Sequence, residues 1–199
     1  MAASGDGTVG DNTIDGAIHR QRLNQRGTAG ALYSIPKPTI AALPGAAAGA
    51  GMALAMACDI RIAADSAFLT TGYRNVALPG DYGISWMLTQ LVGSSKAREL
   101  MFTSERVQAE EALRIGLVNK VVPGADLQQV AFDMARDMAS GPASAMAAMK
   151  DNLEDALTVD YETALDREAE RLVPLSAHPD HNEAVRAFVE KRKPNFQAG

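Results

Sequence analysis

The spacing of apolar and polar positions changes along the chain, from short apolar runs to longer stretches with helical periodicity. Residues 39–43, 59–64 and 67–71 are apolar or alternating runs bounded by proline or turn-forming residues, and each predicts a strand. After residue 83 the apolar positions mostly recur three or four apart, as in 127–138, which predicts helices. The pattern therefore indicates an α/β fold with strands mainly in the first half and helices mainly in the second.

Capping residues and glycines give approximate bounds for the helices. The expected helices cover 13–33, 49–58, 84–91, 95–102, 108–115, 127–138 and 161–172. Two further helices are expected to end near 157 and near 191. A short strand is expected at 117–122. Gly27 and Gly30 weaken the second half of the first helix, and Gly93 is expected to end the helix before it. Residues 174–179, which begin and end with proline, are expected to form a loop.

One stretch, residues 37–59, combines a strand, a break at Pro44-Gly45 and a helix built almost wholly from small apolar residues. A helix of this composition must be buried on most sides. Its first turn, Gly49-Ala50-Gly51, lets another group approach the free backbone N–H groups at the positive end of the helix dipole. The stretch predicts an anion site made of backbone N–H groups, suited to charge that develops on one oxygen during a reaction. Close packing against a neighbouring strand is the alternative explanation.

Composition excludes several functional classes. The 199 residues carry a net charge of -5, which disfavours general binding to nucleic acids or anionic membranes. The single cysteine, Cys58, excludes an intrachain disulfide framework, and His19, His178 and His181 lack the spacing of metal ligands. No stretch has the pattern of a signal peptide or a membrane span. We expect a reduced, cytoplasmic protein without a metal site.

Five groups of segments carry a family resemblance: 35–38 with 45–59, 78–81 with 91–93, 97–103, 109–118, and 182–196. In this order and spacing they resemble the crotonase superfamily, the enoyl-CoA hydratase/isomerase proteins, from about Ile35 to Phe196. The resemblance implies a spiral of ββα turns followed by helices. It suggests a division into a spiral core with the active-site turn, 1–123, and a helical region for oligomerisation and pocket closure, 124–199.

The resemblance also implies a chemistry. Such proteins bind acyl-CoA thioesters as trimers or dimers of trimers, with coenzyme A as part of the substrate and no further cofactor. Two backbone N–H groups hold the thioester oxygen as it becomes an enolate, and fixed donors of this kind lower a barrier by about 3 kcal/mol each. By position Ala50 resembles the second donor, and Gly49 and Gly51 shape its turn.

The sequence departs from the family pattern in two respects. The loop that supplies the first donor in the family has no counterpart before Ile35, so we expect the chain to be truncated at its N-terminus. Hydratases of the family use two glutamates, which would fall at Ala53 and at Gly72 or Tyr73, and none of these positions holds an acid. Ordinary hydration of an enoyl-CoA is therefore not expected.

Asp81 is the candidate acid–base residue. Its position resembles that of the aspartate in dienoyl-CoA isomerases and in ring-isomerising members, and one carboxylate suffices to move a proton between two carbons. An isomerase with Asp81 as proton shuttle is the leading hypothesis, with Tyr73, Gly80 and Tyr82 as substrate-binding neighbours. The alternatives are an N-cap role for Asp81, a hydratase that acts through Asp81, and a non-catalytic protein that binds acyl-CoA or forms oligomers.

The last helix carries two further candidates, Phe188 and Lys191. In the family this helix can lie near the coenzyme A nucleotide of a neighbouring subunit, where a cation suits a phosphate. The alternative is a solvated basic helix end that interacts favourably with the helix dipole.

Overall fold

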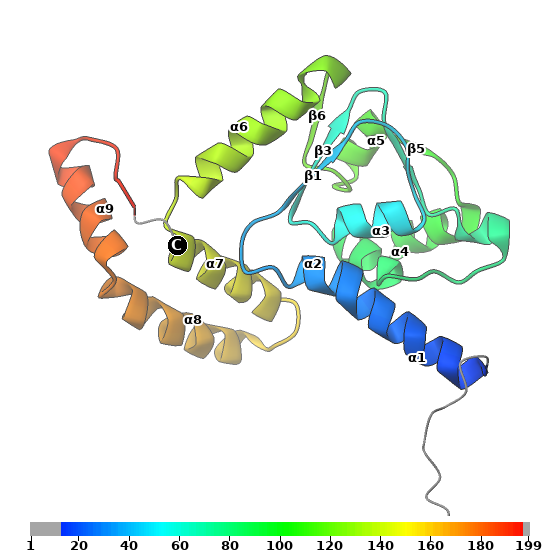
Figure 1. The fold of residues 1–199 in the computed structure, drawn as a ribbon, viewed down its shortest axis with the longest axis horizontal. Coiled ribbons are helices and arrows are strands. Elements are labelled where there is room, and N and C mark those ends of the chain that lie inside the picture. Colours follow the sequence, from blue (N-terminus) through cyan, green and yellow to red (C-terminus); the bar gives the residue numbers. More distant parts are fainter. Residues whose placement is uncertain (1–12, 197–199) are drawn as a thin grey trace, which may run out of the picture.

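The computed structural model describes residues 13–196 (Figure 1). Its helices are α1 (Ile14–Gln25), α2 (Ala31–Tyr33), α3 (Ala50–Met56), α4 (Ile84–Thr103), α5 (Ala109–Arg114), α6 (Leu127–Ala139), α7 (Ala143–Asp155), α8 (Tyr161–Ser176) and α9 (Pro179–Glu190). Three short turns are helical, namely η1 (Arg26–Gly30), η2 (Tyr73–Val76) and η3 (Gly124–Asp126). The strands are β1 (Ile40–Leu43), β2 (Ala47–Ala48), β3 (Ile60–Ala64), β4 (Phe68–Thr70), β5 (Val107–Gln108) and β6 (Lys120–Val122).

The strands form two small sheets. In the first, β3 lies between β1 and β6 and is parallel to both, with Ile40 opposite Ile60 and Ile62 opposite Lys120. In the second, β4 pairs with β2 in parallel and with β5 antiparallel. Because β1 and β2 are followed by α3 and then by β3 and β4, the chain alternates between the two sheets. This is the ββα arrangement that we predicted, and the α/β fold class is confirmed.

Helix α3 lies at the centre of the core. Met52 and Ala53 have no exposed surface, and the small side chains let α3 pack closely against β2 and α4. Burying a side chain as large as Met52 contributes about 1.5–3 kcal/mol to folding. The prediction of a buried small-residue helix is therefore confirmed, and no acid could occupy position 53 without burying its charge.

The first helix begins as predicted and continues further than its glycines suggest. Thr13 is its N-cap, and the Thr13 hydroxyl accepts a hydrogen bond from the backbone N–H of Gly16 at 3.0 Å. Gly27 and Gly30 lie in the π turn η1, through which the helical path passes on to Tyr33. Gly93, with φ 77° and ψ 160°, divides α4 into the two predicted helices at a kink.

The predicted loop over residues 174–179 is wrong in its first half. Helix α8 includes Pro174 and ends at Ser176. Proline removes one backbone donor, and the following turn still closes because the N–H of Ala177 donates to the carbonyl of Pro174 at 3.2 Å. The two-residue strands β2 and β5 were not predicted, because they are too short to show a periodicity.

Helices α8 and α9 lie away from the two sheets (Figure 1). Helix α6 contacts β1 and β3, α7 packs against α8, and α8 contacts α9. The division that we predict at residue 124 falls at η3, just before α6. Within residues 13–196, no helix combines the length and the apolar character that a bilayer span requires.

Candidate active site

The turn into α3 presents a backbone N–H group at the start of the helix. Gly49 has φ 51° and ψ -122°, a conformation that favours glycine, and its own N–H donates to the carbonyl of Thr70 at 3.1 Å. The first helical hydrogen bond runs from the N–H of Ala53 to the carbonyl of Gly49 at 3.0 Å. The N–H of Ala50 therefore belongs to the first helical turn, and N–H groups of this turn have no acceptor further back in the helix.

The segment from Gly72 to Gly83, which contains η2 and leads into α4, carries several left-handed residues. Gly72, Gly80 and Gly83 have φ values of 70°, 114° and 78°, while Ala77 and Tyr82 adopt φ 55° and 51° without being glycine. Left-handed conformations at non-glycine residues cost free energy and persist only where the surroundings impose them. Their concentration in this loop marks it as a functional candidate.

Helix α1 imposes the conformation of Tyr82. The backbone N–H of Tyr82 donates to Oε1 of Gln25 at 2.6 Å, and the Tyr82 hydroxyl accepts a hydrogen bond from Nδ2 of Asn24 at 2.8 Å. Both partners lie on the helix that packs against the loop. Asn24 and Gln25 could not be recognised in the sequence, because polar residues on a surface helix normally indicate only a solvated face.

Asp81 does not cap α4. The N-cap is Gly83, which has no side chain to accept a bond, and the N–H of Ile84 donates to the backbone carbonyl of Asp81 at 3.1 Å. The half-buried carboxylate of Asp81 instead accepts a short hydrogen bond at Oδ1 from the hydroxyl of Tyr73. The N-cap alternative is therefore excluded.

Tyr73 brings the two predicted parts of the site together. Its ring, 6% exposed, lies against Gly49: a Cβ on that glycine would be 3.8 Å from Tyr73 Cζ and 3.9 Å from Tyr73 Oη. Burial, and then the hydrogen bond to Asp81, raise the pKa of Tyr73, so the phenol stays protonated at neutral pH. The hydroxyl of Tyr73 thus lies between the Asp81 carboxylate and the turn that carries Ala50.

A cavity of about 370 Å³ lies beside this loop, between η1 and the start of α4. Its walls are rich in aromatic rings: Tyr82, Tyr33 and Trp86 line it, and the last two meet edge to face with centroids 5.8 Å apart. Tyr82, which we predicted to line an acyl pocket, is therefore on the wall of an apolar cavity, and it follows Asp81 in the chain.

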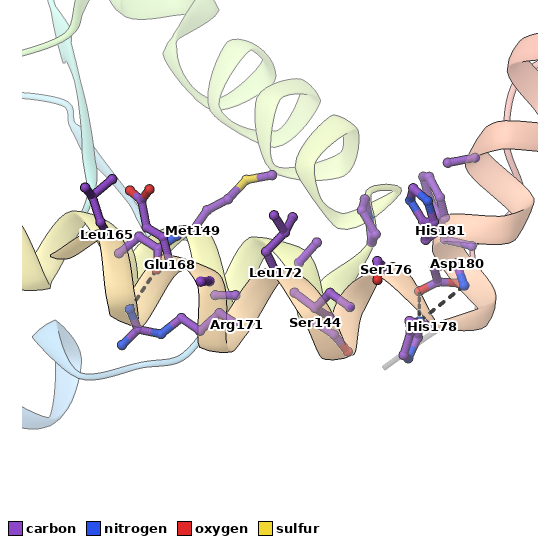
Figure 2. A pocket seen from close by; sticks show the side chains of 18 residues that line it. Ser144, Met149, Leu165, Glu168, Arg171, Leu172, Ser176, His178, Asp180 and His181 are labelled. Carbon is purple, nitrogen blue, oxygen red and sulfur yellow. Dashed lines mark hydrogen bonds and ion pairs between the residues drawn. The ribbon is translucent and has the colours of Figure 1, made fainter. Parts of the chain in front are cut away.

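A larger cavity of about 650 Å³ lies elsewhere, among α7, α8 and α9 (Figure 2). Leu165, Leu172 and Met149 project into the same space, and at its far end Nδ1 of His178 is 3.6 Å from Oδ2 of Asp180. None of its lining residues belongs to the Gly49 turn or to the loop of Asp81. Size alone therefore does not make it the reaction site.

The two C-terminal candidates are not near Asp81 in the same chain. Phe188 is 85% exposed, and Lys191 ends α9 with φ 54°. Figure 1 places α9 at the opposite end of the molecule from α3 and α4. In the part of the chain that the structure describes, no three His, Cys, Asp or Glu side chains are grouped to hold a metal ion.

Comparisons with known proteins identify the family of this chain. The sequence model of a family described as enoyl-CoA hydratase/isomerase matches residues 11–199. The chain is 39% identical over 166 residues to a probable enoyl-CoA hydratase of Rhodobacter capsulatus, covering 83% of this chain and 65% of that protein. It is 36% identical over 167 residues to a 1,2-epoxyphenylacetyl-CoA isomerase of Escherichia coli, covering 83% of this chain and 63% of that protein. The chain thus spans less than two thirds of the length of both relatives.

Solved structures show the same fold. The crystal structure of an enoyl-CoA hydratase from a Polaromonas species superposes with a TM-score of 0.88 at 32% identity, covering 94% of this chain and 72% of that one. The sequence match extends over nearly the whole chain, and the ββα core agrees in three dimensions. The chain therefore belongs to the enoyl-CoA hydratase/isomerase family of the crotonase superfamily.

Proposed function

We propose that this chain acts on acyl-CoA thioesters and shifts a carbon–carbon double bond, with Asp81 carrying the proton. The observation that supports the proposal best is the placement of the Asp81 carboxylate, through Tyr73, beside the turn of Gly49 and Ala50. A hydratase mechanism in which a glutamate activates water is not supported, because the positions where those glutamates would fall hold Ala53, which is fully buried, and Gly72.

The reaction needs one mobile proton and one stabilised oxygen. Asp81 removes a proton from the carbon next to the thioester carbonyl of a 3-enoyl-CoA, and the electron pair of the broken C–H bond moves toward the carbonyl oxygen. The N–H of Ala50 hydrogen-bonds to that oxygen as it gains charge, with Gly49 and Gly51 shaping the turn. The carboxylic acid then returns the proton to the far carbon of the former double bond, which gives the 2-enoyl-CoA. Coenzyme A is part of the substrate, and the steps use no other cofactor.

A direct test compares the full chain with its Asp81→Asn variant on a 3-enoyl-CoA substrate. Conversion to the conjugated 2-enoyl-CoA is followed by its absorbance. A positioned acid–base group contributes roughly 10²–10⁴ in rate, so the variant should lose the shift by at least about 100-fold. Asp126→Asn, at an exposed carboxylate in η3, is the control and should keep the wild-type rate. An active Asp81→Asn variant would rule out the proposed role.

A hydratase that acts through Asp81 is the second candidate, because several relatives carry hydratase names. It would add water to a 2-enoyl-CoA, so the conjugated absorbance would fall and a 3-hydroxyacyl-CoA would form. A third candidate is a protein that binds acyl-CoA without turnover. Binding by calorimetry, unchanged in Asp81→Asn and without conversion of either substrate, would support it.

We also propose that the chain forms homo-oligomers through α7, α8 and α9. These helices expose many large apolar side chains: Met149, Leu153, Leu165, Leu172, Val173, Val185, Phe188 and Val189. Such a concentration is unusual on a monomer. In an oligomer, Phe188 and Lys191 would be placed to contact the coenzyme A of a neighbouring subunit. We also propose a cytoplasmic location, because Cys58 is the chain's single cysteine and has no partner within the chain with which to form a disulfide.

A further inference from the structure

Two properties of Tyr73 stand out from those of an ordinary pocket-lining residue. Its ring is almost fully buried and lies against Gly49, and its hydroxyl donates to one particular oxygen of Asp81, Oδ1. A residue that only lined an acyl pocket would turn its ring toward the substrate and would not need a hydrogen bond to the carboxylate.

We propose that Tyr73 is a positioning residue, which fixes the rotation of the Asp81 carboxylate so that Oδ2 is the oxygen that exchanges the proton with substrate. The inference rests on the proposed function and adds a residue to that same site. A carboxylate turns easily about the bond to its methylene group, and either oxygen can accept a proton. A hydrogen bond that occupies Oδ1 removes this ambiguity and holds the group in one orientation.

The backbone of Tyr73 is held firmly enough for this role. Gly72 turns the chain with φ 70°, the N–H of Leu78 donates to the carbonyl of Tyr73 at 3.1 Å, and the N–H of Asn75 donates to the carbonyl of Gly72 at 3.1 Å. The ring packs against the Gly49 turn, where a Cβ on that glycine would be 3.8 Å from Tyr73 Cζ, an ordinary contact distance. Tyr73 is therefore a rigid spacer between the turn of Ala50 and the carboxylate.

The other side of Asp81 is fixed independently. Tyr82, the next residue, is held by Asn24 and Gln25 of α1. Among residues 13–196, no Lys, Arg or His nitrogen forms an ion pair with Asp81, so no cation competes with the phenol for Oδ1. Besides Asp81, Tyr82 is the titratable group whose charge acts on Tyr73.

The phenol keeps its proton throughout the reaction. Its pKa is raised by burial and by Asp81, so donation of a hydrogen bond is favoured over transfer of the proton. When Oδ2 takes the proton from substrate, the C–H pair remains in the enolate, and the Tyr73 O–H bond stays intact. The same proton leaves Oδ2 for the second carbon, so the balance closes without a further reactant.

The test uses Tyr73→Phe in the full chain, with 3-enoyl-CoA isomerisation as the assay. The ring stays against Gly49 and only the hydroxyl is lost. Hydrogen bonds to charged groups are the stronger ones, so kcat should fall roughly 10- to 100-fold, with KM within about twofold. The variant Tyr73→Phe/Asp81→Asn should be no slower than Asp81→Asn, because Tyr73 acts through that carboxylate.

Thr71→Val is the matched control for a purely structural effect. Thr71 is 1% exposed, neighbours the same turn, and donates through Oγ1 to the carbonyl of Leu100 at 2.9 Å. Loss of the Thr71 hydroxyl should lower the thermal midpoint of unfolding while leaving kcat within about threefold of the wild type. Alkaline absorbance titration gives a readout without turnover: Asp81→Asn should lower the pKa of one tyrosine, and Tyr73→Phe should remove that tyrosine from the titration.

The outcomes separate this inference from the proposed function. If Asp81→Asn abolishes isomerisation and Tyr73→Phe keeps the wild-type kcat, the proposed function stands and the role of Tyr73 is wrong. If adding Tyr73→Phe to Asp81→Asn lowers kcat by the same further factor that Tyr73→Phe causes alone, Tyr73 acts independently of Asp81 and the inference also fails. If the wild-type chain does not isomerise the substrate, the proposed function fails and the inference falls with it.

Discussion

The ammonium group of Lys150 on α7 lies 2.9 Å from carboxylate Oδ2 of Asp59, the residue before β3. The same oxygen accepts hydrogen bonds from the backbone N–H of Thr39 at 2.7 Å and from its hydroxyl at 2.8 Å. Lys150 is only 9% exposed, so water cannot readily replace its partner. This contact joins the helical C-terminal part to the starts of two core strands.

Replacing Lys150 by methionine should destabilise the fold. The substitution keeps the apolar stem but leaves the Asp59 carboxylate, whose side chain is 30% exposed, without its cation. We expect a loss of about 1–3 kcal/mol in the free energy of unfolding, measured by urea denaturation. Lys96→Met removes an exposed i,i+3 pair with Glu99 and should leave the urea midpoint unchanged. Equal midpoints for the two variants would contradict a stabilising contact at Lys150.

Local patterns in the sequence predicted the centre of the fold. The apolar run before Pro44-Gly45 and the small-residue helix after it became β1 and α3, because their neighbours in sequence decide both the break and the burial. The position of Asp81 in a loop before a helix was also readable. The family resemblance added the ββα order, which the two sheets confirm.

Contacts between distant residues could not be read in the same way. Lys150 and Asp59 are 91 residues apart, and Asn24 and Tyr82 are 58 apart, so no periodicity links them. The direction of the Tyr73 side chain depends on the left-handed turn at Gly72 and on its packing against the turn of Gly49. Each of these features is set by tertiary packing, so the sequence alone suggested only that Tyr73 lines a pocket.

Two tyrosines should make the protein less stable at alkaline pH. Burial, and then hydrogen bonds to Glu154 and Asp81, raise the pKa values of Tyr33 and Tyr73 above the ordinary value of 10.0. Below about pH 10 both the folded and the unfolded chain keep these protons, and the stabilisation is complete. Above it the unfolded chain loses them first, so the free energy of unfolding should fall as the pH rises.

The alkaline effect is measured as the urea midpoint between pH 8 and pH 11.5. The double variant Tyr33→Phe/Tyr73→Phe should show a shallower decline above pH 10 than the wild type. Tyr161→Phe, at a side chain that is 77% exposed, should decline as the wild type does. An identical slope in all three proteins would show that the two buried phenols are not linked to folding.

The proposed oligomer should depend on the apolar faces of α8 and α9. Leu172 and Phe188 are 68% and 85% exposed, so a charge at either position would be buried without a partner when subunits associate. We expect Leu172→Glu and Phe188→Glu to reduce the mass observed by sedimentation velocity toward that of one chain. Phe102→Glu, at a 71% exposed position at the end of α4, should leave the mass unchanged. A wild-type mass of a single chain at micromolar concentration would contradict the proposal.

The turn at Gly49 should not tolerate a side chain, for a reason of conformation more than of space. A Cβ there would meet Thr71 O at 3.7 Å and Tyr73 Cζ at 3.8 Å, which are ordinary contacts, but φ 51° with ψ -122° is unfavourable for alanine. Gly49→Ala should therefore cost about 1–3 kcal/mol of stability, or the turn should shift and carry the N–H of Ala50 with it.

Activity separates these two results. A shifted turn should lower kcat for the 3-enoyl-CoA more than it raises KM, because the oxygen gains its charge only during the reaction. Gly45→Ala is the matched control: no atom lies within 4 Å of its added Cβ, and its φ is not left-handed. It should keep both the stability and the kcat of the wild type. If Gly49→Ala behaves like Gly45→Ala in both measurements, the conformation of this turn does not matter and Ala50 is not held by it as a donor.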